Sequence, residues 1–522
     1  MKNIASILIA VIVFKFTGQG QTITYSPPLK ANAQYFTFIG KHRDTILTYI
    51  MQNTGLNQSQ VYMYDNNMQL LQRVPLPLPP DIFGVQLTVY DNFFYLFFQQ
   101  QQKDSVCLQA AKIDMQGNIV GEIMPLDKTF APLTGVDNKI YSIAVSENKK
   151  YFTPFKINAA NGFENLLTTQ LFDENLQLKH TSVLAVPAIK GQDFLTEFNT
   201  DNDGDLVFIR TSESDSTAYV TEKTVLIIKK AITDSVTEAR VIPGNIRLDD
   251  IHLKVDNLNN KYILASFYTD NNTASVEGLY CFTWNKKKNE VEVRRKIALD
   301  DSLRVRANEH GQLKRIFDNL SIQNIILRKD GSFVVDAAFY RLAPYTGYKP
   351  MGETDRPSYY SQPGKQFSHF ASYLPSGYVF YLPGSHFPWN AWNSAYGNRF
   401  TFYGGNIIGF SLDSLAVPVW IKYLDASQFN YNPFYMGYSA HVINNEIYYL
   451  YNQAGRNKSF LAAEAINTDG TPANGVMFMD IDLAVQHNMQ FLPRSMVRLS
   501  GNEVALACQK SGKTYFAKIQ FK

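Results

Sequence analysis

A short phrase recurs along this chain of 522 residues: turn-forming polar residues are followed by an apolar and aromatic run. The phrase is NNEIYYLYNQ at 444–453 and DNFFYLFFQQ at 91–100, and related versions are DNKIYSIAVS, NNKYILASFY and GNEVALACQK. Short alternating segments such as GVQLTVY come before the turns. Because a strand, a short polar turn and a second strand form a β-hairpin, the repeat predicts an all-β chain built from hairpins.

Eight hairpins of this kind are predicted, with their turns at Asp44, Asn92, Asn138, Gly204, Asn260, Gly331, Asn445 and Asn502. A second hairpin often lies between successive copies, as in YDNNMQLL and FDENLQLKH, which gives four strands per repeat. A small four-stranded sheet cannot bury both of its faces alone, and a radial stack of such sheets is a β-propeller. We therefore predict eight four-stranded blades, with seven as the alternative.

Both ends of the propeller are predicted to meet in one blade. The last repeat, from Pro493 to Lys522, supplies only three strands, and the segment TITYS (22–26) supplies a spare one. Pairing the two would close the ring and remove two exposed sheet edges. One helix is expected outside this pattern, over 300–317, where acidic residues come first and basic residues last.

One aromatic-rich insertion, 345–403, interrupts the repeat. It contains 17 aromatic residues in 59 positions, and its removal shortens the outlying repeat of 114 residues to 55. Such a loop either packs on the propeller as a lid or presents aromatic rings to a ligand or partner. Its densest cluster forms the candidate binding surface: Tyr378, Tyr381, His386, Trp389, Trp392 and Tyr396.

The N-terminus predicts export. A basic start is followed by an apolar run, Ile4–Phe14, and Gly18 and Gly20 stand at the −3 and −1 positions for cleavage after Gly20. We therefore expect a signal peptide over 1–20 and a single propeller domain over 21–522; a retained anchor is the alternative. The expected location is periplasmic, outer-membrane-associated or extracellular, and no transmembrane segment is expected in the mature chain.

The net charge limits the classes of partner that the sequence allows, and the cysteine content limits its disulfides. Removal of Lys2 and Lys15 lowers the formal charge from +3 to +1, so no field attracts nucleic acid. The basic run 286–296 alternates charge with Val and predicts the solvated face of a hairpin. Three widely spaced cysteines, Cys107, Cys281 and Cys508, each lie in a strand-like run, which predicts buried free thiols and no disulfide framework.

Two motifs resemble ligand loops but lack essential residues. ACQKSGKT (507–514) begins with Ala where a phosphate-binding loop needs Gly, and a predicted strand follows it. NTDNDGDLVF (199–208) resembles a calcium loop, but Arg210 stands where the twelfth, acidic ligand would be. An ordinary hairpin turn is therefore expected at both places, with no metal and no cofactor. The sequence has no zinc or serine-hydrolase signature, so no catalytic residue is predicted.

The run IILRKDGSFVV, the aromatic-rich loop and NIIGFSLDSLAVPVWIKYL together resemble secreted propeller-like proteins of Gram-negative bacteria. The resemblance implies a place in the cell envelope and defines no activity. The function expected from the sequence is an exported binding or scaffolding propeller with a protein or glycan partner. Two alternatives remain: a polysaccharide-degrading enzyme on a propeller scaffold, and an accessory component of an envelope export or assembly machine.

Overall fold

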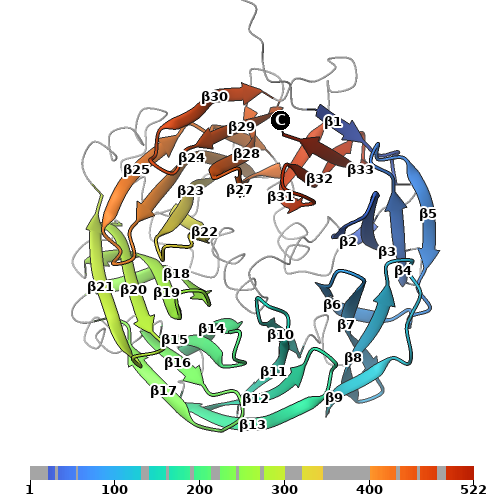
Figure 1. Cartoon of the computed structure of the whole chain (residues 1–522), viewed down its shortest axis with the longest axis horizontal. Helices are drawn as coiled ribbons and strands as arrows, with labels where there is room; N and C mark the ends of the chain where they lie inside the picture. Colours follow the sequence, from blue (N-terminus) through green and yellow to red (C-terminus); the bar gives the residue numbers. More distant parts are fainter. Residues whose placement is uncertain are drawn as a thin grey trace, which may run out of the picture.

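The computed structural model describes residues 22–29, 33–53, 57–130, 140–159, 164–187, 193–212, 224–242, 246–270, 276–299, 320–344, 400–430, 435–454, 459–478 and 489–521. The strands in these ranges form eight antiparallel sheets arranged as a ring (Figure 1). The eight-bladed propeller is therefore confirmed. The described residues contain no α-helix, and the predicted helix over 300–317 lies outside them. No helix in the described ranges is long and apolar enough to cross a membrane.

Blades 1 to 7 each use four consecutive strands, and blade 8 combines three strands from the end of the chain with one from its beginning. The innermost strands are β2 (Ala33–His42), β6 (Ile82–Val89), β10 (Ser142–Val145), β14 (Asp193–Thr200), β18 (Ile246–Asp256), β22 (Leu320–Leu327), β27 (Tyr438–Ile443) and β31 (Gln490–Arg498). The second strands are β3 (Thr45–Asn53), β7 (Phe93–Gln102), β11 (Tyr151–Ala159), β15 (Leu206–Ser212), β19 (Lys261–Asp270), β23 (Phe333–Pro344), β28 (Glu446–Ala454) and β32 (Glu503–Lys510).

The third strands are β4 (Asn57–Tyr64), β8 (Ser105–Asp114), β12 (Glu164–Asp173), β16 (Thr224–Lys229), β20 (Gly278–Asn285), β24 (Phe400–Leu412), β29 (Ser459–Ile466) and β33 (Lys513–Gln520). The outermost strands are β5 (Leu70–Pro75), β9 (Met124–Phe130), β13 (Leu178–Pro187), β17 (Val236–Arg240), β21 (Glu290–Ala298), β25 (Pro418–Leu424), β30 (Pro472–Phe478) and β1 (Thr22–Tyr25). Blade 6 has an additional short strand, β26 (Gln428–Asn430), which pairs with β24.

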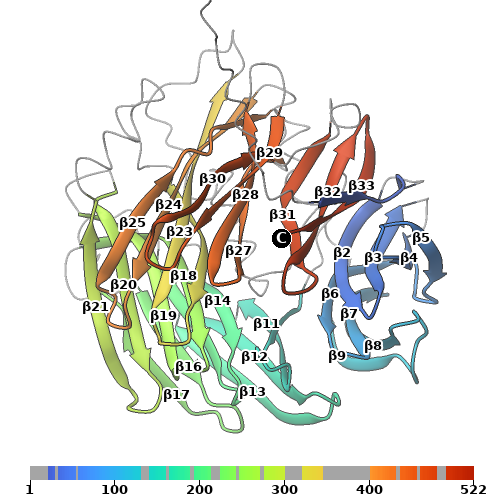
Figure 2. The ribbon, with the colours of Figure 1, turned by 45° about the horizontal axis from the view of Figure 1, so that its top comes forward.

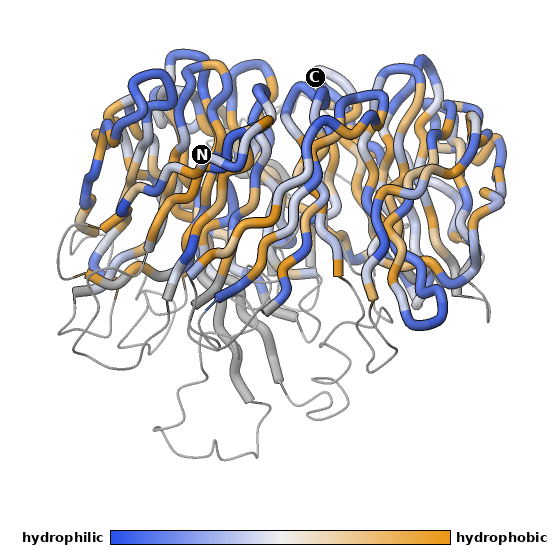
Figure 3. Tube along the Cα trace, turned by 90° about the horizontal axis from the view of Figure 1, so that it is seen from below, coloured by the Kyte–Doolittle hydropathy of each residue, from blue (hydrophilic) through white to orange (hydrophobic). Residues whose placement is uncertain are grey.

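Successive strands of a blade reverse direction, so the ring has two different faces. The tight turns that join first to second and third to fourth strands lie on one face, which we call the turn face; these polar turns form one rim in Figure 3. The links from second to third strands and from blade to blade belong to the opposite face, which we call the connection face. The insertion between β23 and β24 therefore leaves the propeller on the connection face.

An aspartate organises several turns of the turn face. Asp65 Oδ1 accepts hydrogen bonds from the backbone N–H groups of Asn67 and Gln69, both at 2.8 Å. The residue before Gln69, Met68, has a positive φ of 58° and is fully buried. The same arrangement recurs at Asp114, Asp173 and Asp413. The apolar–Asp pattern seen in YDNNMQLL is therefore the sequence signal of a side-chain-capped turn.

The hydrophobic core is divided among the joints between blades. The buried apolar residues form eight clusters, and each cluster combines side chains from two adjacent blades. In the cluster between blades 8 and 1, for example, the Phe516 ring lies 5.3 Å from Phe36 and 5.0 Å from Phe38, centroid to centroid. Since each sheet is covered on both faces by its neighbours, the stability of a blade depends on the closed ring.

The ring closes as predicted. β1 pairs antiparallel with β33, from Thr22 opposite Gln520 to Tyr25 opposite Ala517. Beyond β1, Ser26 N donates to Phe516 O and Leu29 N donates to Thr514 O, at 2.8 and 2.9 Å. The backbone of the N-terminal segment therefore follows β33 for nearly its whole length.

Two further predictions are confirmed and one is wrong. The basic run 286–296 forms the turn between β20 and β21 and most of β21, so it belongs to a hairpin as predicted. Cys107, Cys281 and Cys508 are buried free thiols. The inner hairpin of blade 3, however, turns at 146–150, between β10 and β11, and Asn138 lies outside the described residues. The short strand β10 has four residues, and polar turn-forming residues occur on both sides of it, so the phrase DNKIYSIAVS was assigned to the wrong side.

Candidate functional site: polar joints around the ring axis

Carboxylate side chains connect the inner strands of blades 4 and 5 and of blades 5 and 6. Glu197 of β14 and Asp250 of β18 lie in β-bulges and have positive φ values of 59° and 60°. Gly84 has the same conformation in the corresponding bulge of blade 2, with φ of 57°. A residue with a Cβ is costly in this region of φ, roughly 1–2 kcal/mol, so an acidic residue there calls for a compensating interaction.

For both residues, a hydrogen bond to the next blade is the interaction that compensates for the strained backbone. Glu197 Oε2 accepts a hydrogen bond from the backbone N–H of Leu253 at 2.8 Å. Asp250 Oδ2 accepts one from the backbone N–H of Ile322 at 2.5 Å. In both cases a bulge residue reaches the inner strand of the following blade. Glu197 and Asp250 therefore make the same kind of hydrogen bond between inner strands in two successive joints.

His252 lies between these carboxylates. Its Nε2 is 3.3 Å from Asp250 Oδ1, and its side chain is 22% exposed. Burial opposes a charge on the imidazole, but the charge and hydrogen bond of Asp250, together with the charge of Glu197, outweigh it and raise the pKa of His252 to about 9. Burial also raises the pKa of Glu197, against the opposing effect of His252. The imidazole is therefore a cation at neutral pH.

Asp336 belongs to the second strand of blade 6 and completes the set. Its side chain is 0% exposed. Oδ1 accepts hydrogen bonds from Asn324 Nδ2 at 3.0 Å and from the Tyr438 hydroxyl of blade 7 at 2.5 Å. Burial raises the pKa of Asp336 to about 7 although these two hydrogen bonds lower it. The joint between blades 6 and 7 thus also depends on a carboxyl group.

The chemistry of this set favours a structural role over catalysis. A glycosidase needs two carboxyl groups that both reach the substrate. Asp250 is 1% exposed and Asp336 is 0% exposed, and each is bonded to a neighbouring blade. Within the described ranges, no group of three or more His, Cys, Asp or Glu side chains is arranged to hold a metal ion.

The loop that resembles a calcium site contains a lysine ammonium. Lys286 Nζ of blade 5 lies 2.5 Å from Asp201, 2.6 Å from Asp203 and 3.4 Å from Asp205. Asp201 also accepts a hydrogen bond from the Tyr262 hydroxyl at 2.7 Å. A side-chain cation from the next blade therefore occupies the position among these acidic groups that a bound ion would need.

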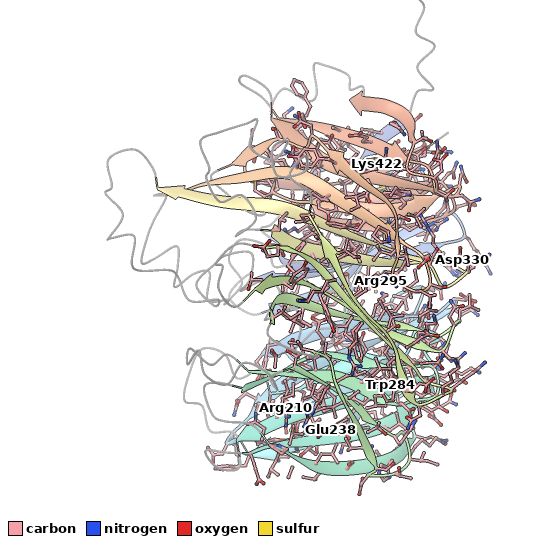
Figure 4. All side chains as sticks on the ribbon, turned by 90° about the vertical axis from the view of Figure 1, so that its left-hand side faces the viewer. Arg210, Glu238, Trp284, Arg295, Asp330 and Lys422 are labelled. Atoms are coloured by element: carbon pink, nitrogen blue, oxygen red, sulfur yellow. The ribbon has the colours of Figure 1, made fainter. Side chains whose placement is uncertain are left out.

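The six sequence-predicted binding residues, Tyr378, Tyr381, His386, Trp389, Trp392 and Tyr396, lie outside the described residues. The base of the insertion is described. β23 and β24, with 12 and 13 residues, pair up to Pro344 opposite Phe400, and β26 adds a third strand at 402–404. In Figures 2 and 4, β23 extends beyond the neighbouring blades, away from the turn that carries Asp330.

Sequence reasoning missed the acidic residues of the joints. The clearest signal was Asp336, which stands alone in the apolar run FVVDAAF of a predicted strand. Charged residues are rarely buried without a partner, so a lone acid in such a run indicates a buried polar contact. For Glu197 and Asp250 the local sequence held no comparable signal, because their bulges appear only in the pairing of the strands.

No protein-family model matches the chain, and no curated protein matches its sequence. Among solved structures it is similar to prolyl endopeptidases, at 9% identity over 94% of this chain and 55% of that chain, with a TM-score of 0.40. It is also similar to the β-propeller domain of the Trilobed protease from Pyrococcus furiosus, at 9% identity over 88% and 98% of the two chains, with a TM-score of 0.35. The chain spans about half the length of the prolyl endopeptidase that it matches. These likenesses concern the fold alone.

Proposed function

We propose that the protein is an exported binding or scaffolding propeller of the cell envelope and that its partner meets the connection face at blade 6. The extended β23–β24 hairpin carries this proposal. With β26, this hairpin forms a three-stranded projection, and no other blade has such a projection in the described residues. The aromatic-rich insertion starts from the tip of the hairpin. Aromatic rings stack on the apolar faces of sugars and are enriched at protein-binding hot spots.

The buried polar groups support a binding role rather than an enzymatic one. The carboxylates nearest the axis are used for contacts between blades, and the two that are most buried cannot meet a polymer substrate without opening a joint. A propeller rigidified in this way is a suitable platform for a surface loop, since rigid scaffolds commonly position functional loops.

Tryptophan fluorescence tests the proposed surface. The chain has four tryptophans, and the two in the described ranges, Trp284 and Trp420, are only 5% and 8% exposed. Quenching of the native protein by acrylamide therefore reports mainly on Trp389 and Trp392. We expect a quenchable fraction in the wild type that is lost in the Trp389→Phe, Trp392→Phe double variant.

The same variant tests binding. The wild type, immobilised on beads, should retain an envelope protein or glycan that the double variant does not retain, while both unfold at the same temperature. Phe130→Ser is a suitable control, because Phe130 is 75% exposed at the end of β9 in blade 2 and should not affect retention. A shielded tryptophan pair, together with a variant that loses stability but no partner, would show that the insertion is only a packed lid.

Export is tested separately by N-terminal sequencing of the protein from the culture or the envelope fraction. We expect the mature chain to begin at Gln21, one residue before β1. Material that begins at Met1 outside the cytoplasm would contradict the proposed cleavage.

A further inference from the structure

We propose that Asp336 is held as a neutral carboxylic acid in the folded protein, and that loss of its proton loosens the joint between blades 6 and 7. The proposal concerns a conformational device and is independent of the partner proposed above. It begins from an unmatched atom: Asp336 Oδ2 is buried and has no hydrogen-bond partner among the residues that the structure describes. Ionising a buried carboxyl group that has a bare oxygen is unfavourable, and retaining the proton avoids the buried charge.

A second unmatched atom lies close by. The Tyr449 hydroxyl of blade 7 is buried and also lacks a hydrogen-bond partner within the described ranges. Gly409 stands directly opposite Asp336 in β24, and a Cβ added to Gly409 would lie 3.5 Å from the Tyr449 hydroxyl. The hydroxyl therefore packs over the strand position beside Asp336. After burial, Asp336 is the first of the groups that raise the pKa of Tyr449.

The two oxygens can be satisfied in one joint without a buried charge. A protonated Oδ2 can donate toward the Tyr449 hydroxyl through a buried water. An ionised Asp336 could accept from that hydroxyl instead, but it would leave a buried negative charge without a cation beside it. A Cβ at position 409 would lie closer still to the Trp420 ring, 3.2 Å from Cζ3, so the space beside Asp336 is shared by Trp420 and the Tyr449 hydroxyl.

The other polar groups around Asp336 do not neutralise its charge. Asn324 of β22 and Tyr438 of β27 are neutral donors to Oδ1. Arg328, in the turn before β23, donates to Ser411 Oγ at 2.9 Å and to Thr468 O at 3.4 Å. His252 of β18 favours ionisation through space, but it is already paired with Asp250. In the part of the chain that the structure describes, Asp336 has no ion-pair partner.

The sign of the pH effect follows from these contacts. Because burial raises the pKa of Asp336 from 3.8 to about 7, its contribution to stability is complete below pH 3.8 and is lost as the pH rises through 7. Asp336 and Pro344, the residue before the insertion, belong to the same strand, β23. Proton release in the joint therefore acts on the strand that supports the proposed binding surface.

Infrared difference spectroscopy of the full chain tests the protonation state. We expect the carbonyl stretch of a protonated carboxyl group to be present at pH 5.5, to disappear with a midpoint near pH 7, and to be absent from Asp336→Asn. Asp330→Asn is the matched control, since Asp330 belongs to the same blade, lies exposed on the turn face and has a lowered pKa because Ser332 donates to it. A wild type without this band at pH 5.5 would overturn the proposal without any variant.

Unfolding in urea tests the consequence. Between pH 5.5 and 8.5 the unfolding constant of the wild type should rise by at least about tenfold more than that of Asp336→Asn. The amide keeps an oxygen for Asn324 and Tyr438 and never ionises, so the variant should be less sensitive to pH. If Asp336→Asn does not fold, Tyr449→Phe replaces it: removal of the hydroxyl should shift the midpoint of the infrared band. An unchanged midpoint would contradict the proposed contact.

Discussion

Polar side chains connect adjacent blades in two regions of the ring, but the chemical groups differ. One region is the joint between blades 2 and 3, and the other comprises the joints from blade 4 to blade 7. Between blades 2 and 3 one set of polar contacts comes from the Gln99 amide, and a Lys156–Asp127 ion pair of 2.6 Å joins the same two blades at the outer strand β9. Gln99 Oε1 accepts from the N–H groups of Ile140 and Tyr141 at 2.9 and 3.0 Å, and Gln99 Nε2 donates to Tyr141 O at 2.9 Å. Between blades 4 and 7 the corresponding contacts come from Glu197, Asp250 and Asp336.

The difference follows from what the next blade presents. The backbone beside Gln99 presents N–H groups and a carbonyl together, and only an amide can both accept and donate. Leu253 and Ile322 each present an N–H group, for which a carboxylate is the stronger acceptor. The Gln99 contacts of this amide joint therefore do not titrate, whereas the contacts made by the carboxyl groups can.

The largest effect is expected at the amide joint. Gln99→Ala leaves three backbone groups without partners in a dry interface and should lower the free energy of unfolding by about 4 kcal/mol. Because an amide does not titrate, the loss should be equal at pH 5.5 and pH 8.5. Urea unfolding measures both, and Gln102→Ala, exposed in the same strand, is the control. A loss of stability that differs between the two pH values would contradict the proposed difference between amide and carboxylate joints.

His252 should have the next largest effect. Its raised pKa means that stability is present below about pH 6.5 and is lost as the pH rises through 9. His252→Gln should therefore cost about 3 kcal/mol at pH 6 and almost nothing at pH 10. The measurement is the midpoint of thermal or urea unfolding against pH. His180→Gln, which removes a pair with an exposed aspartate between blades 3 and 4, is expected to cost less than about 1 kcal/mol. Equal losses at both pH values would contradict the assignment of a charged imidazole.

Lys286 represents a third kind of joint, in which carboxylates meet a cation. Lys286→Gln should lower stability by about 2 kcal/mol, because Asp201 and Asp205 lose an ion pair while buried. Millimolar calcium should then raise the melting temperature of the variant and leave the wild type unchanged. Lys288→Gln, exposed in the same turn, is the control. A clear calcium shift in the wild type that Asp203→Ala abolishes would show that the lysine does not block an ion site.

The smallest loss of stability is expected for Glu197→Gln, which tests the difference between amide and carboxylate joints most directly. Glu197→Gln converts a carboxylate joint to an amide joint, and the new Oε1 still accepts from Leu253 N, so the cost should be less than about 0.5 kcal/mol. Glu197→Ala leaves that N–H unpaired and should cost about 1–3 kcal/mol. Urea unfolding at pH 7 separates the two. Equal losses would mean that the hydrogen bond is not what holds the joint.

Much of the fold was predictable because its signals are local. The turn at Gly204 and the strand that follows it are specified by neighbouring residues, and so is the spare strand at 22–26. The turn of blade 3 was misplaced because β10 has only four residues, too few to show an alternating pattern. With the turn at Asn148, the spacing becomes 56 residues from Asn92 and 56 again to Gly204, so regularity would have been the better guide.

The side-chain contacts between blades could not be predicted from local sequence patterns, as the strands and turns could. Whether Glu197 meets Leu253 depends on how far one blade is rotated from the next, and no local pattern encodes that rotation. The same holds for Lys286, whose partners lie 81 to 85 positions away in the sequence, from Asp205 to Asp201. Asp336 was the exception, since an isolated acid in an apolar strand indicates an unusual environment before any partner is known.

The closure of the ring has a consequence for the order of events during synthesis. The hydrogen bond between Phe516 N and Ser26 Oγ joins residues 490 positions apart. At a common elongation rate of 5–20 residues per second, β1, the outermost strand of blade 8, leaves the ribosome roughly 25 to 100 seconds before its partner β33 exists. Throughout that interval blade 8 is missing, and blades 1 and 7 each lack one of the neighbours that cover them. A chain that folds blade by blade would therefore pass through an open arc with two uncovered apolar ends, which a chaperone can bind and which the final strands cover.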